Sequence, residues 1–265
     1  MFHWIRDHHR DEVRKRPFPP EWDSFVRANV AHYSMLDDAE RTELCATMQV
    51  FLEEKHWEGC GSLDLTDEIR VTIAAQACLL QLGLPHDYYR NVESILVYPS
   101  TVVPPKYQPG VFERVGSPVD DAPTPILGQS FAQGPVILVW DAVLHDARHP
   151  EQGHNLVYHE FAHKLDLLDG TADGTPLFDD RDQFAEWVAV CSREFLRLRG
   201  LAEKGHKTFL DSYGAKNEAE FFAVATEEFF DRPIALHEHA PDLYGVLSAY
   251  YRQDPAGRVN RTRKH

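Results

Sequence analysis

The chain carries two histidines four positions apart, with a glutamate directly after the first: His159-Glu160-Phe161-Ala162-His163. On a helix, positions i and i+4 lie on one face, with their Cβ atoms about 5–6 Å apart. Two imidazoles at that spacing can bind one tetrahedral Zn²⁺ at roughly 2.0–2.1 Å. Glu160 cannot bind the same ion from the next position, but it can reach a water molecule there and accept its proton. The spacing therefore predicts a hydrolytic zinc site.

The residues around the motif support this interpretation. Chance alone would produce HExxH in roughly one chain of this composition in fifteen, so the motif needs a suitable context. LVY precedes the motif, FA lies within it and LDLL comes after Lys164, which predicts a helix with His159, His163 and Asp166 on one stripe and apolar residues elsewhere. The alternative is a pair of core histidines satisfied by carboxylates without a metal. Asp166 is predicted to orient a ligand histidine, and its alternative is a solvated acid.

A catalytic zinc also needs a third protein ligand and an open fourth position. The metzincin pattern would place that ligand ten residues after the first histidine, at Asp169. That pattern also requires a glycine where this chain has Asp166, and a methionine turn below the metal. The methionines, Met1, Met35 and Met48, all precede the motif. The metzincin arrangement therefore does not fit.

A second carboxylate candidate stands about sixty residues further along the chain. The segment NEAEFFA, which begins at Asn217, opens a predicted helix rich in aromatic residues. Glu220 stands there among apolar residues, where an unpaired buried carboxylate is costly and binding zinc would relieve the cost. The alternative is a capping box formed by Asn217 and Glu220. Glu227, two turns further on the same face, either orients a ligand histidine or is a solvated acid beside Glu228.

The elements that must position these residues can be read from periodicity and caps. Asp37 and Asp38 can cap a helix running to about Trp57, and a helix that is apolar on most sides runs from Thr66 to Gly83. Further helices are expected at about 155–168, 181–199, 217–231 and 241–252. The β-branched runs ILVYPS (95–100) and PVILVW (135–140) predict strands, and residues 124–134 are expected to form a hairpin with the second. Seven prolines from Pro99 to Pro125 predict a long loop. Helices, a small mixed sheet and more helices predict a mainly helical α+β class.

Composition narrows the possible functions. The 265 residues include 27 Lys and Arg against 42 Asp and Glu, a net charge of −15, which disfavours direct nucleic-acid binding. The apolar run from Ile73 to Leu84 is too short to span a bilayer, and charges interrupt the N-terminus, so we expect no membrane segment and a cytoplasmic protein. The four cysteines show no CxxC spacing and are expected to be reduced.

We interpret the chain as one domain spanning residues 1–265. Residues 1–20 are charged and end in prolines, so they are expected to form a surface arm. Residues 255–265 carry a basic cluster and are expected to be a flexible tail.

Two separated motifs resemble a known family. The segments HNLVYHEFAHKLD (154–166) and SYGAKNEAEFFAVATEEFF (212–230) are similar to the Mlc titration factor A family, bacterial cytoplasmic zinc peptidases known for binding the glucose repressor Mlc. The resemblance extends from about Phe51 to Asp254. The segment from SYG to NEAEFFA is also similar to the catalytic domain of anthrax lethal factor, a gluzincin-type protease.

The resemblance assigns roles to particular residues. It implies one Zn²⁺ per chain bound by His159, His163 and Glu220, with Glu160 as the general base. It also implies that Tyr213 is an active-site tyrosine, whose phenol O–H can hold the oxyanion of a tetrahedral intermediate.

The resemblance also implies a fold and an activity. It implies a single zincin-like domain with aminopeptidase-type activity on short peptides, and an Mlc-type transcriptional repressor as a partner whose sequestration regulates glucose uptake. The choice between exopeptidase and endopeptidase stays open, because no acid that would hold a substrate amine can be located. The alternative function is a non-catalytic repressor-binding protein whose zinc site is structural.

Overall fold

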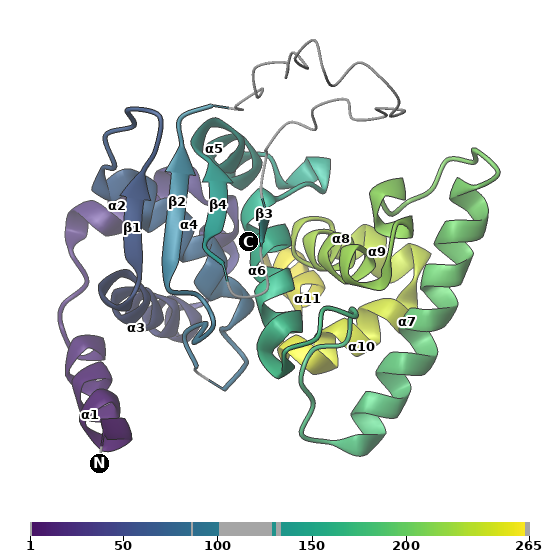
Figure 1. Ribbon diagram of the computed structural model, residues 1–265, viewed down its shortest axis with the longest axis horizontal. Coiled ribbons are helices and arrows are strands. Elements are labelled where there is room, and N and C mark those ends of the chain that lie inside the picture. The colour runs from purple at the N-terminus through teal and green to yellow at the C-terminus, as the bar shows by residue number, and fades with distance from the viewer. Residues whose placement is uncertain (1, 86, 101–128, 131–133, 263–265) are drawn as a thin grey trace, which may run out of the picture.

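The computed structural model of the chain describes residues 2–85, 87–100, 129–130 and 134–262. Within them, one small sheet has the strand order β1-β2-β4-β3 (Figure 1). The strands are β1 (His56–Gly59), β2 (Ser94–Tyr98), β3 (Gln129–Ser130) and β4 (Val136–Val139). The first, second and fourth strands pair in parallel, and β3 pairs antiparallel with β4 at the edge. The sheet is therefore mixed, as expected.

The two predicted strands form where β-branched residues are concentrated. Ile95 and Val97 of β2 are fully buried while their neighbours are half-exposed, so one face of the strand packs on the core. Ile95 pairs with Val136 of β4, and Val136 also pairs with Ser130, so the expected hairpin strand is present. Most of the proline-rich stretch and the turn of that hairpin lie outside the described residues.

Helices make up most of the rest of the molecule, which confirms the mainly helical α+β class. In chain order, the α-helices are α1 (Phe2–Arg14), α2 (Pro20–Asn29), α3 (Asp38–Glu54), α4 (Asp67–Leu80), α5 (Trp140–Arg148), α6 (Leu156–Asp166), α7 (Arg181–Ala202), α8 (Glu218–Asp231), α9 (Pro233–His239), α10 (Pro241–Tyr251) and α11 (Pro255–Thr262). Single 3₁₀ turns are η1 (Ala31–Met35), η2 (Pro150–Gln152), η3 (Leu167–Asp169) and η4 (Ser212–Ala215).

The predicted caps account for several helix starts. Asp37 and Glu40 form a reciprocal capping box at α3, and the Thr66 hydroxyl accepts a hydrogen bond from the backbone N–H of Ile69 at α4. Helix α3 ends at Glu54 rather than continuing to Trp57. The reason is tertiary, because Trp57 pairs with β2 as part of β1.

The N-terminal arm lies on the surface, and the C-terminal segment differs from the expectation. The N-terminal arm contains α1, which lies against α3 through ion pairs from Arg10 to Glu54 and from Arg14 to Glu43. The expected flexible tail contains α11, in which Arg258 is only 5% exposed and pairs with the Glu40 carboxylate at 2.7 Å. The tail prediction was therefore wrong for residues 255–262, since that basic cluster supplies a buried ion-pair partner.

The core surrounds two helices that meet at the centre. Helix α4 is buried on nearly all sides, as predicted, and packs against α2, α3 and α6. Helix α6 lies between the sheet and the C-terminal helices (Figure 1), where it contacts α4, α8, β3 and β4. In the described part of the chain, no helix is long and apolar enough to cross a bilayer.

Candidate metal centre

Helix α6 presents the two histidines of the HExxH motif on one face. The Asn155 side chain caps the helix by accepting a hydrogen bond from the backbone N–H of Tyr158 at 3.0 Å. Tyr158 and Phe161 are fully buried and hold the opposite faces of the helix in the core. His159 and His163 are thereby left at its partly exposed edge, with 15% of each side chain accessible.

Helix α8 brings the distal glutamate to the same place. The Asn217 side chain accepts a hydrogen bond from the backbone N–H of Glu220 at 2.9 Å, so the predicted N-cap is formed. The Glu220 carboxylate does not complete a capping box; it points at the two histidines instead. The apolar residues around it in the sequence, such as Phe221 and Phe222, are buried and fix the helix against α6.

Three donor atoms from these two helices meet at one point. Glu220 Oε2 lies 3.1 Å from His159 Nε2 and 3.3 Å from His163 Nε2, and the two Nε2 atoms are 3.3 Å apart. The donor atoms of the three residues all lie within 4.8 Å of one another. Two imidazoles and a carboxylate in this arrangement are a common ligand set for a hydrolytic Zn²⁺.

The electrostatics of the cluster also fit a cation. Burial lowers the pKa of His159, but hydrogen bonds to Glu220 and Glu227 outweigh burial and raise that pKa to about 10. Burial raises the pKa of Glu220, but its hydrogen bonds with His159 and His163 hold it well below its ordinary value. The Glu220 and Glu227 carboxylates thus favour a positive charge at His159, and a metal ion would supply one.

Glu227 lies behind the cluster and is buried. Its Oε1 is 2.8 Å from His159 Nδ1, and its Oε2 accepts a hydrogen bond from the backbone N–H of Asn155 at 2.8 Å. A carboxylate at Nδ1 fixes the imidazole tautomer and leaves Nε2 free for a metal. Glu227 is therefore placed to orient His159, and it is not a solvated acid.

Asp166 and Asp169 lie outside the cluster of three donor atoms, and an orienting role of Asp166 stays a prediction. Asp166 is fully buried, its Oδ2 accepts a hydrogen bond from the backbone N–H of Gly174 at 3.0 Å, and burial raises its pKa to about 6. It therefore holds the loop that follows α6. Asp169 is exposed and accepts a hydrogen bond from the N–H of Thr171, and it is not part of the cluster.

Glu160 follows His159 in the chain and is buried. The residue is 3% exposed, and its Oε2 has no hydrogen-bond partner among the described residues. Burial raises its pKa to about 7. A buried carboxylate oxygen without a partner, on the residue next to a cluster histidine, is available to take up a proton.

Tyr213 lies at the open side of the cluster. It belongs to η4, and its hydroxyl donates a hydrogen bond to Glu220 Oε1 at 3.3 Å. Its ring centroid is 6.0 Å from that of His159, and the residue is 49% exposed. The hydroxyl is therefore both close to the three donor atoms and accessible from solvent.

Comparison with known proteins identifies the family of this chain. A family model described as glucose-regulated metallo-peptidase M90 matches residues 3–252. The chain belongs to this M90 family. It is 34% identical over 233 residues to Mlc titration factor A of Pectobacterium atrosepticum, covering 84% of this chain and 83% of that protein. The protein of the same name from Serratia proteamaculans is 32% identical, covering 86% of each chain.

A further M90 relative has no functional name. An uncharacterized protein of Synechocystis sp. is 36% identical over 258 residues, covering 96% of this chain and 90% of its own. The resemblance to the Mlc titration factor A family is thus confirmed, and the chain is of a metallopeptidase family. The similarity to anthrax lethal factor stays a prediction.

Two residues near the M90 centre were not predicted. The Lys216 ammonium lies 3.5 Å from the Tyr213 hydroxyl and 3.8 Å from Glu220 Oε1. Asp211 caps η4, because its Oδ1 accepts a hydrogen bond from the Tyr213 N–H at 2.7 Å. The signals were present in the sequence: Lys216 stands four positions before Glu220, and Asp211 stands two before Tyr213, a spacing typical of an Asx turn.

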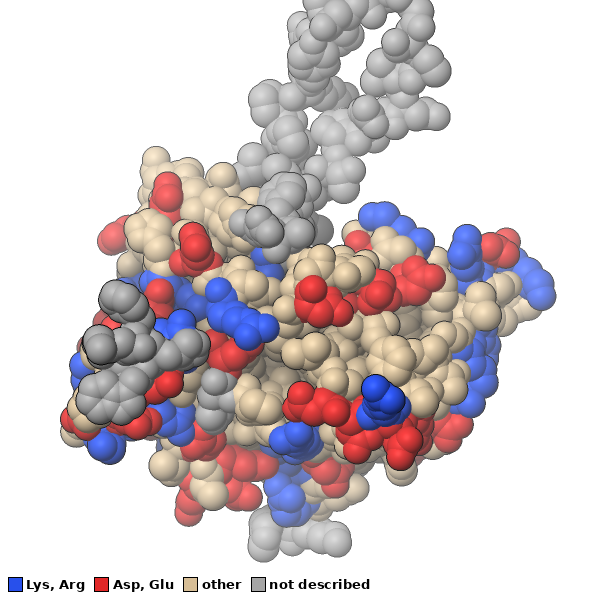
Figure 2. All heavy atoms as spheres, turned by 60° about the horizontal axis from the view of Figure 1, so that its bottom comes forward, with Lys and Arg blue, Asp and Glu red and all other residues tan. Residues whose placement is uncertain are grey.

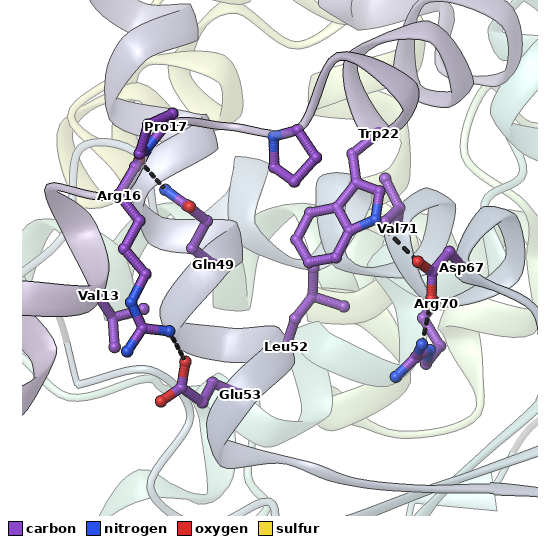
Figure 3. Close-up of a pocket in the computed structure, with 11 residues that line it drawn as sticks. Val13, Arg16, Pro17, Trp22, Gln49, Leu52, Glu53, Asp67, Arg70 and Val71 are labelled. Carbon is purple, nitrogen blue, oxygen red and sulfur yellow. Dashed lines mark hydrogen bonds and ion pairs between the residues drawn. The ribbon is translucent and has the colours of Figure 1, made fainter.

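A cavity in the described part of the chain lies away from this cluster. It has a volume of about 350 Å³ and lies between the α1–α2 connection and helices α3 and α4 (Figure 3). Trp22 and Leu52 line its apolar floor, and the Arg16 guanidinium at its rim is paired with Glu53. None of the predicted site residues lines it, so we do not assign the peptidase site there.

Substituting Glu227 with Gln should weaken metal binding without unfolding the protein. The change removes the negative charge at His159 Nδ1, and loss of such a partner typically costs about 10–100-fold in metal affinity. The measurement is competition with a chelator, with Glu218→Gln, an exposed position at the start of the same helix, as the control. Equal metal affinity in Glu227→Gln and the parent protein would contradict the orienting role.

Proposed function

We propose that this chain is a zinc-dependent peptidase of the aminopeptidase type, holding one Zn²⁺ with His159, His163 and Glu220. The observation that carries the proposal is the convergence of these three side chains from α6 and α8. A bound Zn²⁺ would polarise the scissile carbonyl and lower the pKa of a water molecule.

Two further residues of the chain carry out proton transfer and oxyanion stabilisation in this mechanism. Glu160 accepts the proton of the attacking water on a carboxylate oxygen and later delivers it to the leaving amine. The Tyr213 hydroxyl donates a hydrogen bond to the carbonyl oxygen as negative charge develops on it. The exposed position of Tyr213 beside Glu220 supports this assignment.

The substrate backbone has a candidate position at the sheet edge. Strand β3 is the last strand in the described sheet and contacts α6, which carries the histidines. An extended peptide can add to such an edge by main-chain hydrogen bonds. We propose that substrate lies along β3 with its scissile bond next to the cluster.

Metal analysis of the purified protein tests the ligand set. We expect one zinc per chain, loss of activity on chelation and recovery when zinc is restored. In a crystal structure of the zinc form, direct ligation places each donor at roughly 2.0–2.2 Å. A Glu220 oxygen more than about 4 Å from the metal would remove Glu220 from the ligand set.

The type of peptidase is tested by two substrate sets. An aminoacyl-nitroanilide reports cleavage next to a free amine, and the same compound with an acetylated amine reports whether that amine is required. We propose that only the free-amine compound is hydrolysed. Cleavage of both would make the enzyme an endopeptidase, and zinc binding without hydrolysis of either would favour a structural zinc site.

A second function is suggested by the names of relatives, which are called Mlc titration factor A. We propose that this chain also binds and sequesters an Mlc-type transcriptional repressor. Glu160→Gln separates the two functions, since it removes the general base and leaves the surface of the protein unchanged. If repressor binding persists in this variant, sequestration does not require catalysis.

A further inference from the structure

An exposed apolar face lies on α7 and the loop before it. Leu177, Phe184 and Val188 are 52%, 48% and 40% exposed, and they are three of the five large apolar side chains that are exposed in the described part of the chain. Phe184 and Val188 are four positions apart on α7 and share a face. The Phe184 ring also lies 6.3 Å from that of Phe178, the neighbour of Leu177. Clustered apolar exposure of this kind is typical of a contact surface.

Acidic side chains surround this apolar face. Residues 169–188 contain six acids and one base, Arg181, and therefore carry a net charge of −5. All six acids are exposed, and within the described residues none forms an ion pair. They are Asp169, Asp173, Asp179, Asp180, Asp182 and Glu186. In Figure 2, where the lower side of Figure 1 comes forward, acidic side chains border uncharged surface.

Three of the six acids of this segment are held in fixed positions. The carboxylates of Asp169, Asp173 and Asp180 each accept hydrogen bonds from backbone N–H groups two or three residues further on. Each also has a second oxygen that faces no described partner. These three negative charges are thus fixed by turns of the backbone.

The same segment packs against the metal centre. Gly174 has a φ of +73°, and a Cβ there would lie 2.3 Å from the Glu218 carbonyl oxygen, so its backbone touches the start of α8. Trp187, one turn from Phe184, donates a hydrogen bond to the Gly174 carbonyl at 3.1 Å. The apolar face therefore adjoins the helix that carries Glu220.

We propose that residues 169–188 form a docking surface for a basic polypeptide segment with apolar anchors. The apolar side chains of that segment contact Leu177, Phe184 and Val188, and its Lys and Arg residues meet the surrounding carboxylates. The proposal does not depend on the peptidase activity. The negative charge of residues 169–188 favours a basic partner, because it repels nucleic acids and anionic lipids. A symmetric contact with a second copy of the chain would place two surfaces of charge −5 against each other.

Binding of a synthetic helical peptide to the full-length zinc-loaded protein tests the proposal. The probe is a labelled amphipathic helix of Lys and Leu, compared with a peptide in which Ser replaces Leu, at about 0.15 M salt. We expect the Lys/Leu peptide to bind at least about tenfold more tightly than the Lys/Ser peptide. Failure of the Lys/Leu peptide to bind would overturn the proposal.

Matched variants locate the binding. Phe184→Ser/Val188→Ser removes the apolar anchors, and Asp179→Lys/Glu186→Lys reverses two charges that cap no turn. Each should weaken Lys/Leu peptide binding at least about tenfold. The control Asp64→Lys/Glu238→Lys makes the same charge change at exposed, unpaired positions elsewhere and should leave binding unchanged. If the control weakens binding equally, overall charge and not this surface is responsible.

Two further measurements separate this proposal from others. The rate of aminoacyl-nitroanilide hydrolysis and the circular dichroism spectrum should be the same in all three variants and the parent protein. If the parent protein hydrolyses no nitroanilide, the peptide-binding result still stands, because binding does not require catalysis. Sedimentation of the parent protein tests for a second copy on this face. A concentration-dependent dimer that Phe184→Ser/Val188→Ser lacks would assign the face to self-association and overturn the proposal.

Discussion

Replacing Glu160 with Gln should leave the zinc content unchanged and lower the kcat for peptide hydrolysis by about 10²–10⁴-fold. The amide has nearly the same shape as the carboxylate but cannot accept a proton. Glu160 is 3% exposed and its Oε2 has no described partner, so no ion pair or hydrogen bond at that oxygen is lost. A neutral side chain is also easier to bury, so the fold should tolerate the change.

Two measurements make this prediction specific. Zinc per chain is determined on the same preparation as kcat, and Glu238→Gln, an exposed glutamate on α9, serves as the control for the substitution itself. Loss of zinc in Glu160→Gln would show a structural role for the residue. Full activity with zinc retained would show that another group accepts the proton.

The parts of the fold that could be predicted are those set by local patterns. Helix α6 and its two histidines depend on an i,i+4 spacing and on Asn155 as a cap, all within a dozen residues. Helix α4 is apolar on most sides, a pattern that favours burial. Glu220 stands 57 positions after His163, yet its position among aromatic residues marked it as a carboxylate in need of a partner.

The parts that could not be predicted depend on tertiary partners. Strand β1 has the sequence HWEG, which contains no β-branched residue, and it is a strand because His56 to Gly59 pair with β2. The basic sequence of helix α11 is typical of a flexible end. The helix is ordered because Arg258 pairs with Glu40, more than two hundred residues earlier in the chain. The position of Lys216 next to the Tyr213 hydroxyl could not be predicted, because it depends on the conformation of η4.

Tyr213 is the residue whose role depends most on this local folding. Asp211 caps the turn that carries it, and its hydroxyl donates to Glu220 Oε1 at 3.3 Å. Burial and the Glu220 carboxylate raise the pKa of the phenol, so the hydroxyl keeps its proton near neutral pH and acts as a hydrogen-bond donor. A donor beside the cluster can stabilise an oxyanion that forms only during the reaction.

Substituting Tyr213 with Phe should therefore leave folding and zinc content unchanged, because the ring still packs and no ligand is lost. The kcat should fall by about 10²–10³-fold, the usual effect of removing one oxyanion donor, with a smaller change in KM. Tyr98→Phe, on strand β2, is the matched control because that strand carries no residue of the cluster. An unaltered kcat would show that Tyr213 takes no part in catalysis. A raised KM with constant kcat would show that Tyr213 binds substrate equally in the ground state and the transition state, because kcat falls only when a contact specific to the transition state is lost.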